Sequence, residues 1–231
     1  MSTNEAPADP PAATVTRREL AVARALDQAR SRAENRVELF LDAARELMSA
    51  NSGEFTVQEV VDRSGQSLRT FYQYFAGKHE LLLALFEESI RAAGAHLAET
   101  VAGTEDPLER LHDFTHEYFR MCRLTPKREL GSGLPPPIVE FAQQLLVSRP
   151  EEAAQAFAPL VVQLEELLTD AAAAGALRPG LDLRRIAGVV LQATMFNSFA
   201  AAISGSSVRA DGEVESDALW EMLLGGIGAR D

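Results

Sequence analysis

The sequence contains a single cysteine, Cys122, so no disulfide bond can form within the chain. A lone cysteine suits a reducing compartment, where it is usually a small buried hydrophobic residue and less often a redox sensor. No apolar run reaches the roughly 20 residues that cross a bilayer, and the N-terminus lacks the pattern of a signal peptide. These absences predict a cytoplasmic protein without membrane contact.

Basic residues are in the minority, because 22 Lys and Arg stand against 34 Asp and Glu, for a net charge of −12. This balance alone opposes nucleic acid binding, which needs cations to neutralise phosphates. The acidic excess lies mostly in the second part of the chain. Residues 16–91 carry 11 basic and 12 acidic residues, whereas residues 92–231 carry 11 basic and 20 acidic residues. The first part is therefore nearly neutral.

The usual marks of an enzyme are also missing: there is no Gly-rich phosphate loop, no Gly-x-Ser-x-Gly motif and no cysteine cluster. His112 and His116 are four residues apart, which places both imidazoles on one helix face, as in some zinc sites. Asp113 stands where zinc proteases have glutamate, however, and no histidine follows downstream. We expect polar contacts for this pair, and predict no metal, no cofactor and no catalytic residue.

Apolar residues recur at helical spacing along most of the chain, and no alternating strand pattern of useful length is present. The sequence therefore predicts an all-α protein with about nine helices. Their expected ranges are 36–49, 56–64, 67–75, 78–101, 107–124, 138–147, 150–177, 183–203 and 215–227. Pro159 predicts a kink or a break near Phe157, because proline removes one backbone donor. Residues 1–15 are rich in Ala, Pro and Thr and read as a mobile tail.

The segment from Thr56 to Phe75 has the composition of a helix-turn-helix. Thr56 and Glu59 form the pattern of a capping box, Gly65 permits a tight turn, and Ser67 can cap the second helix. Three apolar side chains can pack inward: Leu68, Phe71 and Phe75. The residues then left available for DNA are Gln66, Ser67, Arg69, Thr70, Tyr72 and Gln73. The alternative is a plain pair of packed helices with a solvated polar face.

The run from Ser64 to Phe86 resembles the most recognisable stretch of the TetR family of transcriptional regulators. The matching residues are Gly65, Ser67, Thr70, Phe71, Tyr72, Tyr74, Phe75, Lys78, Glu80 and Leu81. Two departures are Gln66, where the family usually has a small aliphatic residue, and Val60-Val61 in place of a frequent Ile-Ala. The resemblance is specific over about residues 36–90. Beyond them it rests only on the number of helices, one long middle loop and two apolar C-terminal helices.

This resemblance implies a tail and basic arm (residues 1–33), a helix-turn-helix DNA-binding domain (34–77), and a ligand-binding and dimerisation domain (78–231). It implies binding to double-stranded operator DNA, with Arg69 and Gln73 as base-reading candidates. The full set of expected DNA-binding residues is Thr56, Gln66, Ser67, Arg69, Thr70, Tyr72, Gln73 and Lys78. The expected function is repression of a palindromic operator, with activation as an alternative, and a helical sensor without DNA recognition as another.

The resemblance also implies a homodimer and a small apolar effector. The last two helices would pair with those of a second subunit, and the alternative is that their apolar residues complete a monomeric core. The expected effector-binding residues are Phe86, Phe114, Tyr118, Met121, Phe141, Phe157, Leu160, Leu164 and Phe199. Six arginines between residues 17 and 36 form a basic arm, which either adds contacts to DNA or is an ordinary solvated helix.

Overall fold

The structure is a computed structural model that describes residues 16–50, 55–122, 136–203 and 212–229. These residues form nine α-helices, and one isolated backbone pairing joins Leu177 to Gly228. The helices are α1 (Arg17–Ala50), α2 (Val57–Ser64), α3 (Leu68–Tyr74), α4 (Lys78–Val101), α5 (Pro107–Cys122), α6 (Pro136–Ser148), α7 (Pro150–Ala173), α8 (Leu183–Ile203) and α9 (Gly212–Ile227). The all-helical fold is therefore confirmed, whereas the expected tail of residues 1–15 lies outside the described residues.

Helix α1 is much longer than the sequence analysis predicted, because it begins at Arg17 instead of Arg36. A capping box starts it: the Thr16 N–H donates to Glu19 Oε2 at 2.7 Å, and the Glu19 N–H donates to Thr16 Oγ1 at 3.3 Å. Good helix formers then continue the helix without Gly or Pro. The basic arm is thus the first half of α1, and residues 17–32 of it are exposed to solvent.

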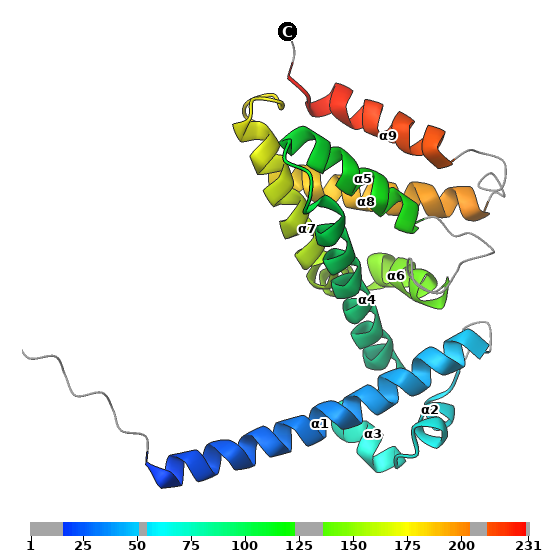
Figure 1. Cartoon of the computed structure of the whole chain (residues 1–231). Helices are drawn as coiled ribbons and strands as arrows, with labels where there is room; N and C mark the ends of the chain where they lie inside the picture. Colours follow the sequence, from blue (N-terminus) through cyan, green and yellow to red (C-terminus); the bar gives the residue numbers. More distant parts are fainter. Residues whose placement is uncertain (1–15, 51–54, 123–135, 204–211, 230–231) are drawn as a thin grey trace, which may run out of the picture.

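The helices α1, α2 and α3 form a group at one end of the molecule (Figure 1). An aromatic cluster of Phe40, Phe71 and Phe75 holds them together. The Phe40 ring lies edge-on to Phe71 and Phe75, with ring centroids 5.3 Å and 6.2 Å away. All three side chains are buried. Edge-to-face pairs of this kind add to the stabilisation from buried apolar area.

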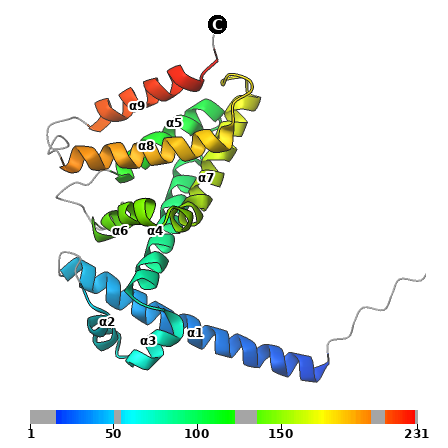
Figure 2. The same ribbon diagram turned by 180° about the vertical axis from the view of Figure 1, so that it is seen from behind.

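Helix α4 leads from this group to the remaining helices, which gather at the other end in both views (Figures 1 and 2). There α7 packs against α4, α5, α6 and α8, while α5 also contacts α8 and α9. Two backbone hydrogen bonds fix the end of α9: the Arg178 N–H donates to the Ile227 carbonyl and the Ala229 N–H to the Ala176 carbonyl, both at 2.9 Å. One buried apolar core runs through both groups.

Helix α7 continues across Pro159, so the break expected there is not present. Proline removes one hydrogen bond of the helical ladder, but tertiary packing can outweigh this local cost. Phe157, two residues before Pro159, and Leu160, directly after it, are both buried. None of the described helices is long and apolar enough to cross a membrane.

The aromatic cluster leads to a stability prediction. Replacing Phe40 by Ala removes a fully buried ring and should lower the free energy of unfolding by about 3–5 kcal/mol. Guanidinium denaturation measures this change. The control is Leu39→Ala on the same helix. Leu39 is 43% exposed, so its replacement should lower the free energy of unfolding by less than about 1 kcal/mol. Equal losses for the two variants would contradict the assigned role of the cluster.

Candidate nucleic-acid interface and effector cavity

Helix α2 is closed at both ends by the residues that the sequence indicated. The Glu59 N–H donates to Thr56 Oγ1 at 3.2 Å, and the Thr56 N–H donates to Glu59 Oε2 at 2.7 Å. Hydrogen bonds from the Thr56 backbone and side chain lower the pKa of the Glu59 carboxyl. Gly65 ends the helix with φ of 65°, the left-handed conformation that glycine adopts without strain. The Gln66 N–H then reaches back to the Val61 carbonyl at 3.3 Å.

Helix α3 follows this turn directly, so α2 and α3 form a helix-turn-helix. Ser67 caps α3, because the Thr70 N–H donates to Ser67 Oγ at 3.0 Å and the two hydroxyls lie 2.8 Å apart. Phe71 and Phe75 anchor one side of the helix in the aromatic cluster. A seven-residue helix is too short to persist alone in water, so this packing is what holds it in place.

The opposite side of α3 is open to solvent. Its exposed residues are Ser67, Leu68, Arg69, Tyr72 and Gln73, while Gln66 and Thr70 are half-buried. The structure therefore brings six of the expected DNA-binding residues together on the turn and on one short helix. Their hydroxyl, amide and guanidinium groups include the donors and acceptors that contact phosphates and base edges.

Leu68 corrects one expectation about this helix. The sequence predicted that it packs inward with Phe71 and Phe75, but its side chain is 42% exposed. Leu68 lies at the first turn, before the position at which α3 meets Phe40 and becomes buried. It therefore joins the solvent-facing set as an apolar group, which is the type of side chain that contacts thymine methyls.

The two remaining DNA-binding candidates, Thr56 and Lys78, both make structural contacts. The Lys78 ammonium donates to the Phe55 carbonyl at 2.6 Å and lies 4.4 Å from the centre of the Phe55 ring. It thereby ties the start of α4 to Phe55, the residue before the N-cap of α2. The Thr56 hydroxyl is engaged in the capping box, although Thr56 itself is exposed.

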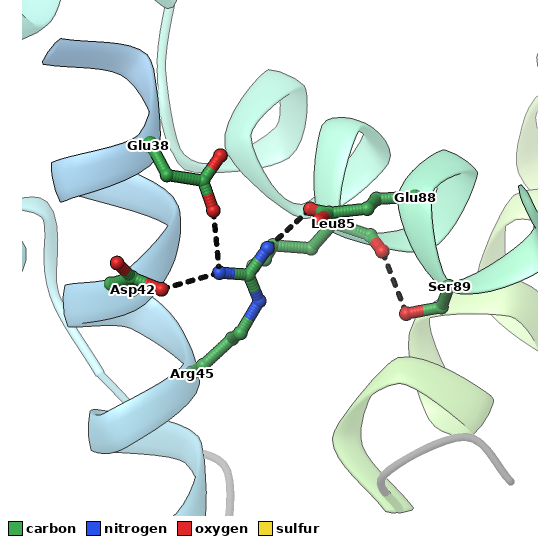
Figure 3. Close-up of polar contacts among 6 residues, drawn as sticks. All are labelled: Glu38, Asp42, Arg45, Leu85, Glu88 and Ser89. Atoms are coloured by element: carbon green, nitrogen blue, oxygen red, sulfur yellow. Dashed lines mark hydrogen bonds and ion pairs between the residues drawn. The ribbon is translucent and has the colours of Figure 1, made fainter. Parts of the chain in front are cut away.

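Arg45 connects the DNA-binding end of the chain with α4. Its guanidinium contacts Glu38 at 3.1 Å and Asp42 at 2.6 Å, both on α1, and it also pairs with Glu88 on α4 (Figure 3). Partial burial by itself would lower the pKa of Arg45, but the hydrogen bonds and charges of Glu38 and Glu88 outweigh it and raise that pKa. Arg45 therefore stays charged and links the two helices.

Most of the expected effector residues are packed in the core. Those that are buried are Phe86, Phe114, Tyr118, Phe141, Phe157, Leu160 and Leu164, whereas Met121 is half-buried. The Tyr118 hydroxyl donates to the Leu191 carbonyl at 3.2 Å, and burial raises the pKa of this phenol. The side chain of Phe199 lies outside the described residues.

A cavity of about 590 Å³ lies between α6, α7 and α8. Among the expected effector residues whose side chains the structure describes, Phe157 alone lines it. Its other walls include Leu146, Val161 and Leu191, and the start of α8 adds Arg184 and Arg185. Sequence analysis missed these residues because spacing within one helix does not reveal which faces of three helices meet around a space. The cavity combines apolar walls with these two arginines and the carboxylate of Asp182.

His112 and His116 lie on α5, as predicted from their spacing, with ring centroids 4.1 Å apart. Their partner comes from α9, where Asp217 Oδ1 is 3.4 Å from His116 Nε2. Because about a hundred residues separate Asp217 from the histidines, no local sequence signal could have placed it there.

The family profile described as bacterial regulatory proteins, tetR family, matches residues 40–85. These residues include the buried part of α1, the whole helix-turn-helix and the start of α4. The helix-turn-helix part of this chain is therefore similar to the DNA-binding region of TetR-family regulators. This match indicates a DNA-binding transcriptional regulator with an N-terminal helix-turn-helix, and regulators of this family are not enzymes.

Solved structures of TetR regulators share this fold over most of the chain. A TetR-family regulator from Pectobacterium atrosepticum has a TM-score of 0.65 at 17% identity and covers 87% of this chain and 98% of its own. FadR from Bacillus subtilis, solved in complex with stearoyl-CoA, has a TM-score of 0.59 at 18% identity. The match covers 82% of this chain and 98% of FadR. SmeT, the repressor of the Stenotrophomonas maltophilia multidrug efflux pump SmeDEF, has a TM-score of 0.58 at 19% identity. The match covers 84% of this chain and 90% of SmeT. A search of curated proteins finds no match.

Proposed function

We propose that this TetR regulator is a homodimeric repressor that binds a palindromic operator and is released by a small apolar effector. The observation that carries the proposal is the exposed polar face of α3, held in place by the buried Phe71 and Phe75. The second helix of a helix-turn-helix enters the major groove, and its N-terminal residues contact base edges.

Each exposed residue of α3 has a role that follows from its chemistry. Arg69 reads guanine, Gln73 reads adenine, and Leu68 contacts a thymine methyl. Residues that hold phosphates or the groove edge are Thr56, Gln66, Ser67, Thr70, Tyr72 and Lys78. Arg17, Arg18 and Arg24 are exposed on the free half of α1 and form no ion pair with any described residue, so they add phosphate contacts.

Exposed apolar groups on α8 and α9 support a dimer. Val189 and Phe196 on α8 are 58% and 45% exposed, and Met222 on α9 is 66% exposed. Between these helices lies an apolar groove of about 520 Å³ that Val189 and Met222 help to line. Apolar surface gathered in this way marks a protein contact, and pairing α8 and α9 with their copies would form a four-helix bundle.

The cavity between α6, α7 and α8 supports the effector proposal. Its walls are mostly apolar, and Arg184 and Arg185 of α8 also line it. A long apolar molecule with an anionic group, such as a fatty acid or its coenzyme A ester, matches this combination. The relative FadR was solved with stearoyl-CoA. Effector binding must favour the arrangement of helices that binds DNA less well, since a ligand shifts an equilibrium only through differential affinity.

DNA binding is the first test. Fluorescence anisotropy of a labelled fragment from upstream of the gene should show salt-sensitive binding, and Arg69→Ala should weaken it by about 1–3 kcal/mol. Arg91→Ala is the matched control, because Arg91 is exposed on α4 away from α3, and it should bind as the wild type does. If selection from a random DNA library also yields no bound sequence, a sensor without DNA recognition becomes the better interpretation.

The dimer is tested by the mass of the protein in solution. Val189→Asp places a charge in the apolar surface of α8 and should shift the species from two chains to the 25.1 kDa of one chain in analytical ultracentrifugation. Val162→Asp is the control, because Val162 on α7 is exposed to a comparable degree, at 41%. A wild-type chain that sediments as a monomer at micromolar concentration would overturn the dimer proposal.

The effector cavity is tested by filling it. A Cβ added at Gly188, which lines the cavity on α8, meets no atom within 4 Å. Gly188→Phe should therefore keep DNA binding and raise the concentration of acyl-CoA or fatty acid needed for release at least about tenfold. Gly188→Ala, which adds one methyl group, should respond nearly as the wild type does. If the same concentration of acyl-CoA or fatty acid releases the wild type and Gly188→Phe from DNA, this cavity is excluded as the effector site.

A further inference from the structure

Two histidines of α5 form an imidazole pair that the proposed regulatory function does not use. The rings of His112 and His116 are 4.1 Å apart and inclined by 33°. Their i, i+4 spacing brings both side chains to the same face of the helix. The side chains are 38% and 24% exposed, so they lie at the surface but within the packing of neighbouring helices.

Helix α9 completes the group with a carboxylate. Asp217 Oδ1 is 3.4 Å from His116 Nε2. One nitrogen from each histidine and one oxygen of Asp217 all lie within 4.8 Å of one another. In a tetrahedral zinc site with bonds of about 2.0 Å, neighbouring ligand atoms are about 3.3 Å apart, so small side-chain movements would bring the three atoms onto one ion.

Asp113 makes the hydrogen bond that would orient the His112 ring as a metal ligand. Its Oδ1 lies 3.2 Å from His112 Nδ1, and its Oδ2 accepts a hydrogen bond from the Thr104 hydroxyl at 3.0 Å. A carboxylate on Nδ1 fixes the tautomer of the ring and leaves Nε2 to bind a metal, as in many histidine metal sites. The edge of the Trp220 indole also packs against the His112 ring, with centroids 5.1 Å apart.

We propose that His112, His116 and Asp217 bind a divalent transition metal of the zinc class and thereby join α5 to α9. Two imidazoles and one carboxylate are a donor set suited to Zn²⁺, Co²⁺ and Ni²⁺, and water fills the fourth position. The sequence predicted no metal because a third ligand was missing from the region of the histidines. Asp217 supplies that ligand from α9.

Binding should stabilise the attachment of α9. Among the described helices α9 packs mainly on α5, and backbone hydrogen bonds to Ala176 and Arg178 hold only its C-terminal end. Asp217 lies in the N-terminal part of α9, so an ion at this site would fix the part of the helix that those bonds do not hold.

The test uses the full chain without an affinity tag, stripped of metal by a chelator and titrated with Co²⁺. Trp220 is the only tryptophan and touches His112, so bound Co²⁺ should quench its fluorescence, and visible absorption should report the coordination geometry. We expect one Co²⁺ per chain, displaced by Zn²⁺. At a hundredfold excess over Kd, Zn²⁺ should raise Tm by about 5 °C.

Variants decide which residues bind the ion. His116→Gln and Asp217→Asn should each weaken Co²⁺ binding at least about tenfold and abolish the Tm increase. The matched control is the double variant His79→Gln and His96→Gln, which removes the two other histidines, paired with Glu152 and Glu117, and should bind as the wild type does. Unchanged affinity in Asp217→Asn, or loss of binding in the control, would overturn the assignment, as would a wild type that binds no Co²⁺.

Discussion

The packing of Phe71 and Phe75 against Phe40 is the constraint on which the DNA-binding part of the chain depends. Helix α3 has seven residues, and capping by Ser67 alone cannot hold so short a helix in one orientation. The three buried rings attach it to α1, the longest helix of the structure. Because one side of α3 is fixed in this way, the side chains on the other side keep a constant position relative to α1.

Helix α4 transmits this arrangement to the rest of the molecule. Lys78 ties its first turn to Phe55, and Glu88 pairs with Arg45 of α1. Further along the helix, Phe86 packs against Phe157 of α7, and Phe157 lines the cavity proposed for the effector. The cavity is thus in contact with α4 through Phe157 and Phe86, and α4 is in turn joined to α1 by the ion pair between Glu88 and Arg45.

Local patterns in the sequence predicted local structure well. The capping box at Thr56, the turn at Gly65 and the cap at Ser67 each depend on neighbours within a few residues, and the structure confirms them. The same capping pattern recurs at Thr16 and Glu19 and starts α1 at Arg17, well before the start that the spacing of apolar residues predicted.

The features that sequence analysis missed depend on tertiary contacts. Leu68 is exposed because α3 meets α1 only from Phe71 onward, and the walls of the cavity come from three helices. Helix α7 continues through Pro159 because its neighbours are buried, which spacing along one helix does not reveal. Asp217 approaches His116 only because α9 packs on α5.

The contacts of Arg45 have an electrostatic consequence for the approach of DNA. One guanidinium faces the carboxylates of Glu38, Asp42 and Glu88, so the cluster carries an excess of two negative charges. It lies where α1 meets α4, whereas α3 lies on the other side of α1 (Figures 1 and 3). Phosphates are repelled from a cluster of this charge, so its field opposes an approach of the duplex to that side of α1.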